Sequence, residues 1–204
     1  MLTRRRELGY RGAVSVFLDT TTGMGLAGAT GVRPYLPPLL AGALARGDIG
    51  IDFDGTDWSF LESPGFLLAV LAVGVVVYLM ERSGMGRAIE IFSGVLGIVL
   101  GAMLFAGALA DGGTDAWPGL IAGPICAILG WLAVGGLIER ARRRLEAGAA
   151  ALMTAYADAA ALLLAAIAIF LPPVSILAIV AFVVLLLGGR RREGEKYAGL
   201  RVLR

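Results

Sequence analysis

Four ionisable side chains lie within otherwise apolar sequence, and they are the residues of this chain best suited to chemistry. Arg33 lies in the run Gly-Val-Arg-Pro-Tyr-Leu-Pro-Pro at positions 31–38, Asp19 lies upstream, and Glu90 and Asp158 lie inside later apolar segments. A charge at the centre of a membrane helix costs at least about 2–3 kcal/mol, so such residues usually serve a function. A pair of Arg33 with Asp158 or with Asp19 would lower the desolvation cost of both partners.

Two interpretations of these charges stay open. In the functional one, a polar mid-membrane cavity binds an ion or small anion and is lined by Asp19, Arg33, Tyr35, Asp158 and Glu90. In the structural one, a buried pair only fixes the register of two helices, and Glu90 and Asp19 extend to the membrane surface.

Three prolines interrupt the segment that carries Arg33. Pro34, Pro37 and Pro38 lack the backbone N–H donor, so each must start or kink a helix. A broken helix exposes carbonyl groups. An ion-binding cavity needs such groups, but any kinked core helix shows them too.

Several residue types that catalysis relies on are scarce. The chain has no histidine and a single cysteine, Cys126. The first absence removes the commonest general base and zinc ligand. The second excludes an intrachain disulfide and a cysteine-cluster metal site. No paired carboxylates are predicted at one end of a span, so we expect no enzyme, no cofactor and no metal.

One acidic run resembles a calcium-binding loop. It reads Asp52-x-Asp54-Gly55-x-Asp57, but no glutamate falls at the bidentate position when Gly55 is placed at the turn. Apolar and polar residues alternate over residues 49–60 around Asp54-Gly55, so a small surface hairpin is the preferred interpretation.

Glycine motifs occur in three places. The pattern Gly23-x-Gly25-x-x-Gly28 matches the dinucleotide fingerprint but lacks the strand, turn and helix that this function requires. Close helix packing is therefore the preferred role of these glycines. The patterns that begin at Gly97 and Gly119 match the small-residue motif of helix association. They favour packing within the chain and leave a homodimer open.

The composition indicates the elements that must position these residues. The chain has 204 residues, 58% of them hydrophobic and 17% charged, and its mean hydropathy is +0.81. These values favour an all-α helical bundle in a membrane, formed by residues 1–204 as a single domain. Five segments are close to the length of a membrane span, namely residues 65–80, 91–110, 117–138, 147–171 and 173–187.

The sixth predicted crossing is irregular. Residues 12–45 are too many for one span and contain charged residues and prolines. The simplest solution is a crossing near residues 30–45, preceded by an interfacial or re-entrant segment over residues 12–29. A cleavable signal peptide is the alternative, but Asp19 and three threonines interrupt its apolar stretch.

The loop charges predict the orientation, because basic residues stay on the cytoplasmic side. Arginines gather in the N-terminal segment 1–11, in the segment 139–146 and in the tail 189–204, whereas the loop 47–63 is acidic. We therefore expect six spans with both termini in the cytoplasm. Seventeen of the eighteen basic residues are arginine, which is typical of a GC-rich bacterial genome, so the predicted location is a bacterial cytoplasmic membrane.

Two further expectations follow from this arrangement. Three spans followed by three spans allow a 3+3 inverted repeat, with a faint echo between residues 25–28 and 119–123. The predicted partners are the lipid bilayer and its anionic headgroups, and no nucleic acid is expected. The headgroup contacts are assigned to Arg140, Arg142, Arg143 and Arg144.

Several short stretches resemble a family of bacterial membrane proteins known as domain of unknown function 4126. They are residues 31–38, Trp58-x-x-Leu61-x-Ser63-Pro64, Glu81 and Glu195-Lys196-Tyr197-x-Gly199-Leu200-Arg201. The resemblance supports the topology and implies no activity. Two functions remain: a small transporter or channel built round Arg33, Asp19 and Asp158, or a non-catalytic scaffold or partner-binding protein.

Overall fold

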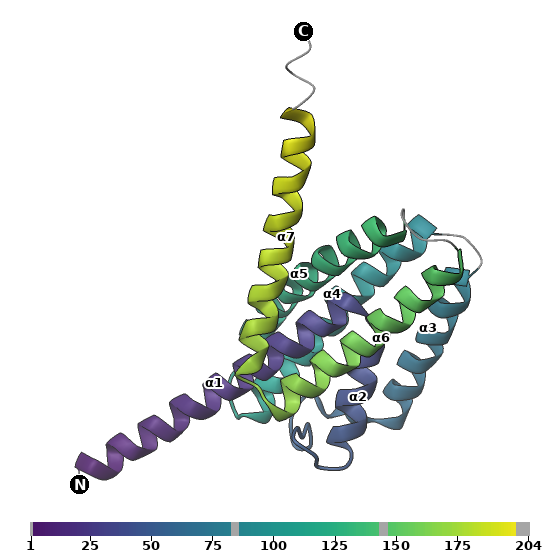
Figure 1. The fold of residues 1–204 in the computed structure, drawn as a ribbon. Coiled ribbons are helices and arrows are strands. Elements are labelled where there is room, and N and C mark those ends of the chain that lie inside the picture. Colours follow the sequence, from purple (N-terminus) through teal and green to yellow (C-terminus); the bar gives the residue numbers. More distant parts are fainter. Residues whose placement is uncertain (1, 83–85, 143–146, 199–204) are drawn as a thin grey trace.

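The chain is entirely helical wherever its structure is described. The computed structural model describes residues 2–82, 86–142 and 147–198, and within these ranges it contains seven α-helices, one 3-10 helix and no strand (Figure 1). The all-α prediction is therefore confirmed. In chain order the elements are α1 (Leu2–Val32), α2 (Leu36–Ala45), η1 (Ser59–Glu62), α3 (Pro64–Arg82), α4 (Gly86–Asp111), α5 (Trp117–Arg142), α6 (Ala147–Phe170) and α7 (Val174–Ala198).

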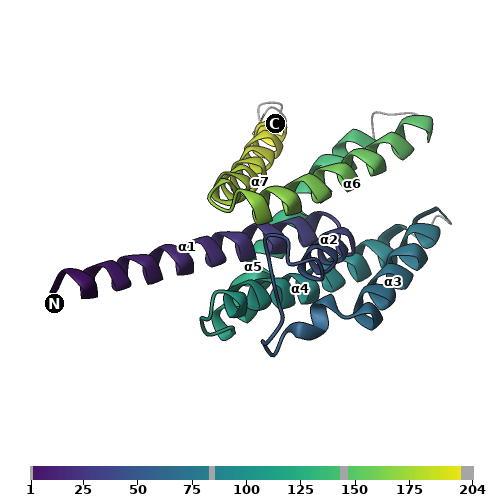
Figure 2. The same cartoon turned by 90° about the horizontal axis from the view of Figure 1, so that it is seen from below.

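The second half of α1 is the centre of the bundle. It runs between α6 and α7 on one side and α4 and α5 on the other, while its first half projects outward (Figures 1 and 2). Leu26, Ala27 and Ala29 are completely buried. Four threonines in the second half of the helix donate their hydroxyls to carbonyls of the preceding turn, as in Thr30 Oγ1 to Ala27 O at 2.7 Å. This satisfies the polar groups within the helix itself.

Glycines let the central helices approach closely. Gly97 and Gly101 of α4 face Thr30 of α1, and a Cβ added at either position would lie within 2.7 Å of it. Gly119 of α5 faces the backbone of Ala106 in the same way. Both small-residue motifs are thus used for packing within the chain, as predicted, and they provide no evidence for a homodimer.

The glycines of the dinucleotide-like pattern have the same role. Gly23 faces Phe105, Gly25 faces Ser175, and Gly28 faces Ile179. All three lie inside one continuous helix with another helix against each, so close packing explains them.

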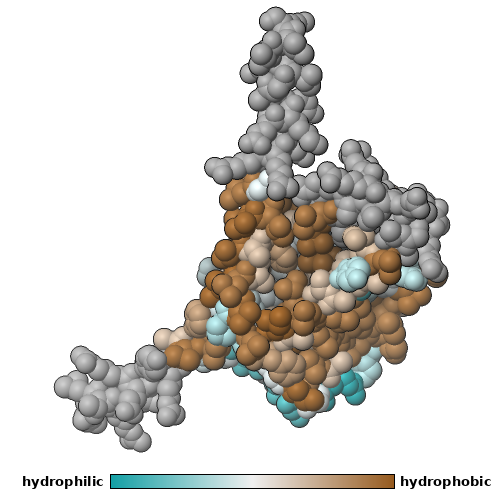
Figure 3. Space-filling view, in the orientation of Figure 1, coloured by the Kyte–Doolittle hydropathy of each residue, from teal (hydrophilic) through white to brown (hydrophobic). Residues whose placement is uncertain are grey.

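Four helices are long and apolar enough to cross a membrane. Their apolar stretches are Pro64–Glu81, Ala88–Asp111, Trp117–Gly135 and Leu152–Phe170, and shorter apolar helical stretches are Leu36–Ala45 and Val174–Gly188. The visible face of the bundle is largely hydrophobic, and hydrophilic residues gather at its lower edge (Figure 3). Five of the predicted spans fall on α3–α7, and four of these helices, α3–α6, are long and apolar enough to cross.

The first predicted crossing differs from the structure. Residues 12–29 belong to the continuous helix α1, and the chain breaks at residues 33–35, inside the predicted span 30–45. Pro34 disfavours a helical conformation at Arg33, which ends α1. Pro37 and Pro38 fall in the first turn of α2, where a missing N–H donor costs little.

The two helices on either side of this break form a hairpin that enters the bundle and returns. Asp19 of α1 lies beside Gly112, just after α4, whereas Arg33 lies beside Glu81 near the end of α3. α2 then leads back, because Ala45 belongs to the same core cluster as Leu104 of α4 and Ile169 of α6.

This hairpin bears on the predicted six crossings, which the structure leaves as a prediction. We call the end with loops 46–63 and 112–116 the acidic end, and the end with the connections from α3 to α4 and from α5 to α6 the basic end. The sequence predicts a single crossing before Asp48, whereas a hairpin leads into the bundle and back to the same end. It places the start of the buried part of α1 at the acidic end. The side chains of the predicted cytoplasmic segment 1–11 lie outside the described residues.

Two other predictions are affected. The loop 49–60 is no hairpin of strands, because Ile51 and Phe53 insert into the core beside α2 and α4, and the loop continues through turns to η1. The predicted inverted repeat compares residues 25–28, upstream of Pro34, with residues 119–123, just before Pro124. α1 ends before Pro34, whereas α5 continues through Pro124, so the two prolines act differently and the inverted repeat stays a prediction.

Candidate functional site: a charge cluster at the helix break

Arg33 lies at the end of α1 and binds two carboxylates from distant helices. Its Nη1 donates a hydrogen bond of 2.9 Å to Oε1 of Glu81 on α3. Its Nε lies 2.6 Å from Oδ1 of Asp158 on α6, within ion-pair distance, although the N–H is not aligned for a hydrogen bond. The predicted pair of Arg33 with Asp158 is present. We call Arg33, Glu81 and Asp158 the Arg33 cluster.

The local sequence explains how the cluster forms. The backbone N–H of Arg33 still bonds to the carbonyl of Ala29 at 3.1 Å, so its side chain leaves from the last turn of α1. Tyr35 follows in the break, is 7% exposed, and packs its ring against Gly74 of α3. The break therefore positions Arg33 between α3 and α6, with Tyr35 beside the cluster.

The cluster has more negative than positive groups. One guanidinium faces two carboxylates, so the ionised cluster carries one net negative charge. The Arg33 side chain is 11% exposed, whereas those of Glu81 and Asp158 are 24% and 29% exposed. The arginine is enclosed, and part of each acidic side chain remains exposed.

The cluster lies nearer the basic end than the middle of the bundle. Asp158 is six residues after Leu152, where the apolar stretch of α6 begins, which corresponds to about 9 Å of helix. Glu81 is the last residue of the apolar stretch of α3. Relative to these apolar stretches, the cluster lies closer to one end than the predicted mid-membrane position.

Glu81 is the functional candidate that sequence reasoning missed. It appeared only among the residues of the family resemblance, because a glutamate at the end of a span normally needs no partner. Its one signal was its position beside Arg82 on the last turn of an apolar helix.

Two other predicted site residues lie elsewhere. Asp19 is fourteen residues before Arg33 on α1, about 21 Å of helix, and its carboxylate contacts Gly112. Glu90 is exposed on α4. Neither belongs to the Arg33 cluster.

The predicted headgroup contacts cannot be placed. The side chains of Arg140, Arg142, Arg143 and Arg144 lie outside the described residues.

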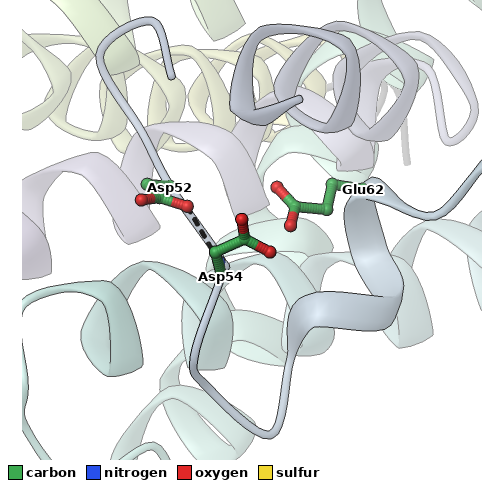
Figure 4. A group of neighbouring side chains, drawn as sticks. All are labelled: Asp52, Asp54 and Glu62. Atoms are coloured by element: carbon green, nitrogen blue, oxygen red, sulfur yellow. Dashed lines mark hydrogen bonds between the residues drawn. The ribbon is translucent and has the colours of Figure 1, made fainter. Parts of the chain in front are cut away.

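A second group of carboxylates meets at the acidic end. Asp52 and Asp54 of the loop and Glu62 of η1 point toward one another (Figure 4), and their oxygens lie within 4.8 Å. Glu62 is buried, and this burial raises its pKa above the usual value, as do the neighbouring carboxyl groups of Asp54 and Asp52. No metal was predicted here, because the calcium-loop spacing places no glutamate at the required position.

Long apolar helices, a largely hydrophobic visible face and, among the described side chains, a buried arginine paired with two carboxylates define the class: this is a helical integral membrane protein. Its family follows from comparison with known families. Residues 20–192 match the model of the domain of unknown function DUF4126, and the chain belongs to that family, as the resemblance indicated. No curated protein and no solved structure matches the chain.

Proposed function

We propose that this protein is a small transporter or channel for a cation, with H⁺ included, and that the Arg33 cluster is its ion-binding site. The observation that carries the proposal is the composition of the cluster. A buried arginine alone would favour an anion, but here two carboxylates already neutralise it. The remaining negative charge favours a cation or a proton, which replaces the earlier expectation of an ion or small anion.

The helix break supports the same proposal. Non-helical backbone inside a membrane occurs where protein or a water-filled cavity satisfies its polar groups, and broken helices form the ion sites of many transporters. Here the break lies at residues 33–35, next to the cluster. We further propose that α1 and α2 form a re-entrant hairpin and that α3–α7 cross the membrane.

The arginine bias supports a bacterial cytoplasmic membrane, and the charges of the connections that follow α2 support placing the basic end in the cytoplasm. Arg140, Arg142, Arg143 and Arg144 would then contact anionic lipid headgroups, each contributing about 1 kcal/mol. The protein is proposed to have no catalytic activity.

The test is ion flux in proteoliposomes that contain the purified chain. We expect cation or proton flux above that of empty liposomes, and we expect Asp158→Asn and Glu81→Gln to abolish it. Glu90→Gln is the matched control, because Glu90 is an exposed membrane-helix carboxylate outside the cluster. If flux in the cluster variants equals that of the Glu90→Gln protein, the cluster is not the pathway.

The second candidate is a non-catalytic scaffold, and one observation favours it. Only 17% of the apolar stretch of α3 is buried within the chain, so this helix offers a long apolar face to lipid or to another protein. Absence of flux for H⁺, Na⁺ and K⁺ in the unmodified protein would reject the transport proposal and leave this one.

A further inference from the structure

We propose that Asp52, Asp54 and Glu62 form a binding site for a divalent cation, best suited to Ca²⁺, at the acidic end of the bundle. The proposal is independent of ion transport, because the Arg33 cluster lies toward the opposite end. The three residues belong to the segment that joins α2 to α3 (Figure 4).

The spacing of the oxygens fits one cation. Ca²⁺ binds carboxylate oxygens at 2.3–2.6 Å in a flexible geometry, so two oxygens on the same ion are at most about 5 Å apart. One oxygen from each of the three carboxylates lies within 4.8 Å of the others. Mg²⁺ requires bonds of 2.0–2.1 Å and near-octahedral geometry, whereas the flexible geometry of Ca²⁺ accepts any oxygen spacing up to this 4.8 Å limit, which favours Ca²⁺.

Glu62 provides the independent observation that points to a ligand. Glu62 is only 9% exposed, and its Oε2 is buried without a hydrogen-bond partner among the described residues. The carboxylate is directed toward Asp52 and Asp54 (Figure 4), and the backbone N–H of Phe53 contributes one hydrogen bond to it, which leaves Oε2 without a donor. A buried carboxylate oxygen without a partner is unfavourable, and a cation bound at this point would satisfy it.

The surroundings allow the remaining ligands to be water. Asp54 and Glu62 line an open cavity of about 340 Å³ together with Asp48, Ser59 and Ser63. Arg46 also lines this cavity, yet within the described ranges no arginine forms an ion pair with the three carboxylates. Among the described side chains, no cation therefore neutralises the three carboxylates.

The loop conformation holds two of the ligands in place. The backbone N–H of Asp54 donates to Oδ1 of Asp52 at 2.8 Å, and Phe53 between them is completely buried. Leu61, before Glu62, is 1% exposed. Buried neighbours thus anchor both arms of the site, which lowers the ordering cost of binding.

Isothermal titration of the purified full-length chain in detergent tests the proposal, with CaCl₂ and MgCl₂ as probes. We expect one Ca²⁺ per chain with a dissociation constant of about 0.1–1 mM, the range of weak oxygen-ligand sites, and weaker binding of Mg²⁺. Asp54→Asn and Glu62→Gln should each weaken Ca²⁺ binding at least tenfold. Asp57→Asn is the matched control, because Asp57 is exposed in the same loop but outside the cluster.

Each outcome decides the question. Loss of binding in Asp54→Asn, with binding kept in Asp57→Asn, supports the site even if Glu62→Gln fails to fold. No heat above the detergent baseline up to 5 mM Ca²⁺ would overturn it. Equal weakening in Asp54→Asn and Asp57→Asn would also overturn it, because the acidic loop would then attract cations without a defined site.

Discussion

At the scale of single residues, Arg33 has the largest structural role. Among the described side chains it is the only cation within 4 Å of a carboxylate. Its two partners, Glu81 and Asp158, lie 48 and 125 residues later in the sequence, on two different helices. Burying three charged groups is unfavourable unless each is paired, so the partners depend on one another. Removal of the central arginine would leave two partly buried carboxylates without a counter-charge.

Arg33→Ala is therefore expected to destabilise the protein by about 3–5 kcal/mol, the usual effect of breaking a buried pair. The control, Arg46→Ala, removes an exposed arginine and should change stability by no more than about 0.5 kcal/mol. Equilibrium unfolding in mixed micelles measures both. Adding Glu81→Gln and Asp158→Asn to Arg33→Ala should restore part of the lost stability. Equal stability of Arg33→Ala and Arg46→Ala would contradict the prediction.

Part of this cluster was predictable from the sequence. Arg33 and Asp158 each stand alone in apolar segments, where an unpaired charge is so unfavourable that a partner is expected. Glu81 could not be found this way, because a glutamate at the end of a span can reach water without help. Its pairing depends on where the break of α1 meets α3, which is a tertiary feature.

At the scale of elements, α1 was the least predictable helix. Hydropathy identified α3–α7 because those helices face lipid over much of their surface, as Leu68, Val95 and Leu163 do. The inner half of α1 is surrounded by other helices, so it needs small residues rather than hydrophobic ones. Its glycines and threonines were therefore interpreted as an interfacial or re-entrant segment rather than a central helix.

Gly31 tests the close contact between α1 and α5. A Cβ at this position would overlap the carbonyl oxygen of Ala127 and lie 2.8 Å from the backbone nitrogen of Trp131. Backbone atoms cannot move aside without shifting a helix, so Gly31→Ala should destabilise the protein by about 1–3 kcal/mol. Thermal unfolding followed by circular dichroism measures the change.

Gly135→Ala is the matched control for this substitution. Gly135 lies in α5, and an added Cβ would meet nothing within 4 Å. Alanine is the better helix former by about 1 kcal/mol, so this variant should be as stable as the unmodified protein or more so. If Gly31→Ala were tolerated equally well, α1 and α5 would not be packed as described.

At the scale of the whole molecule, the two ends of the bundle differ in charge and in the site that each contains. The acidic end carries the three carboxylates of the proposed cation site, and the Arg33 cluster lies toward the basic end. The charge asymmetry was predictable from the loops, because lipid imposes it on the sequence. The return of α2 to the acidic end was not, since it depends on the three-residue break at residues 33–35 rather than on hydropathy.

This course of the chain leads to a test of topology by cysteine labelling. In a Cys126→Ser background, single cysteines at Ala13, Asp57 and Asp115 should all react with a membrane-impermeant maleimide applied to intact spheroplasts. A cysteine at Ala198 should react only after permeabilisation, because α7 ends at the basic end. The decisive position is Ala13, because α1 enters the bundle from the acidic end, beside Gly112. Labelling of Ala13 together with Ala198, and not with Asp57, would show that α1 and α2 do not form a hairpin open to the acidic side, and the six-span arrangement with both ends in the cytoplasm would replace it.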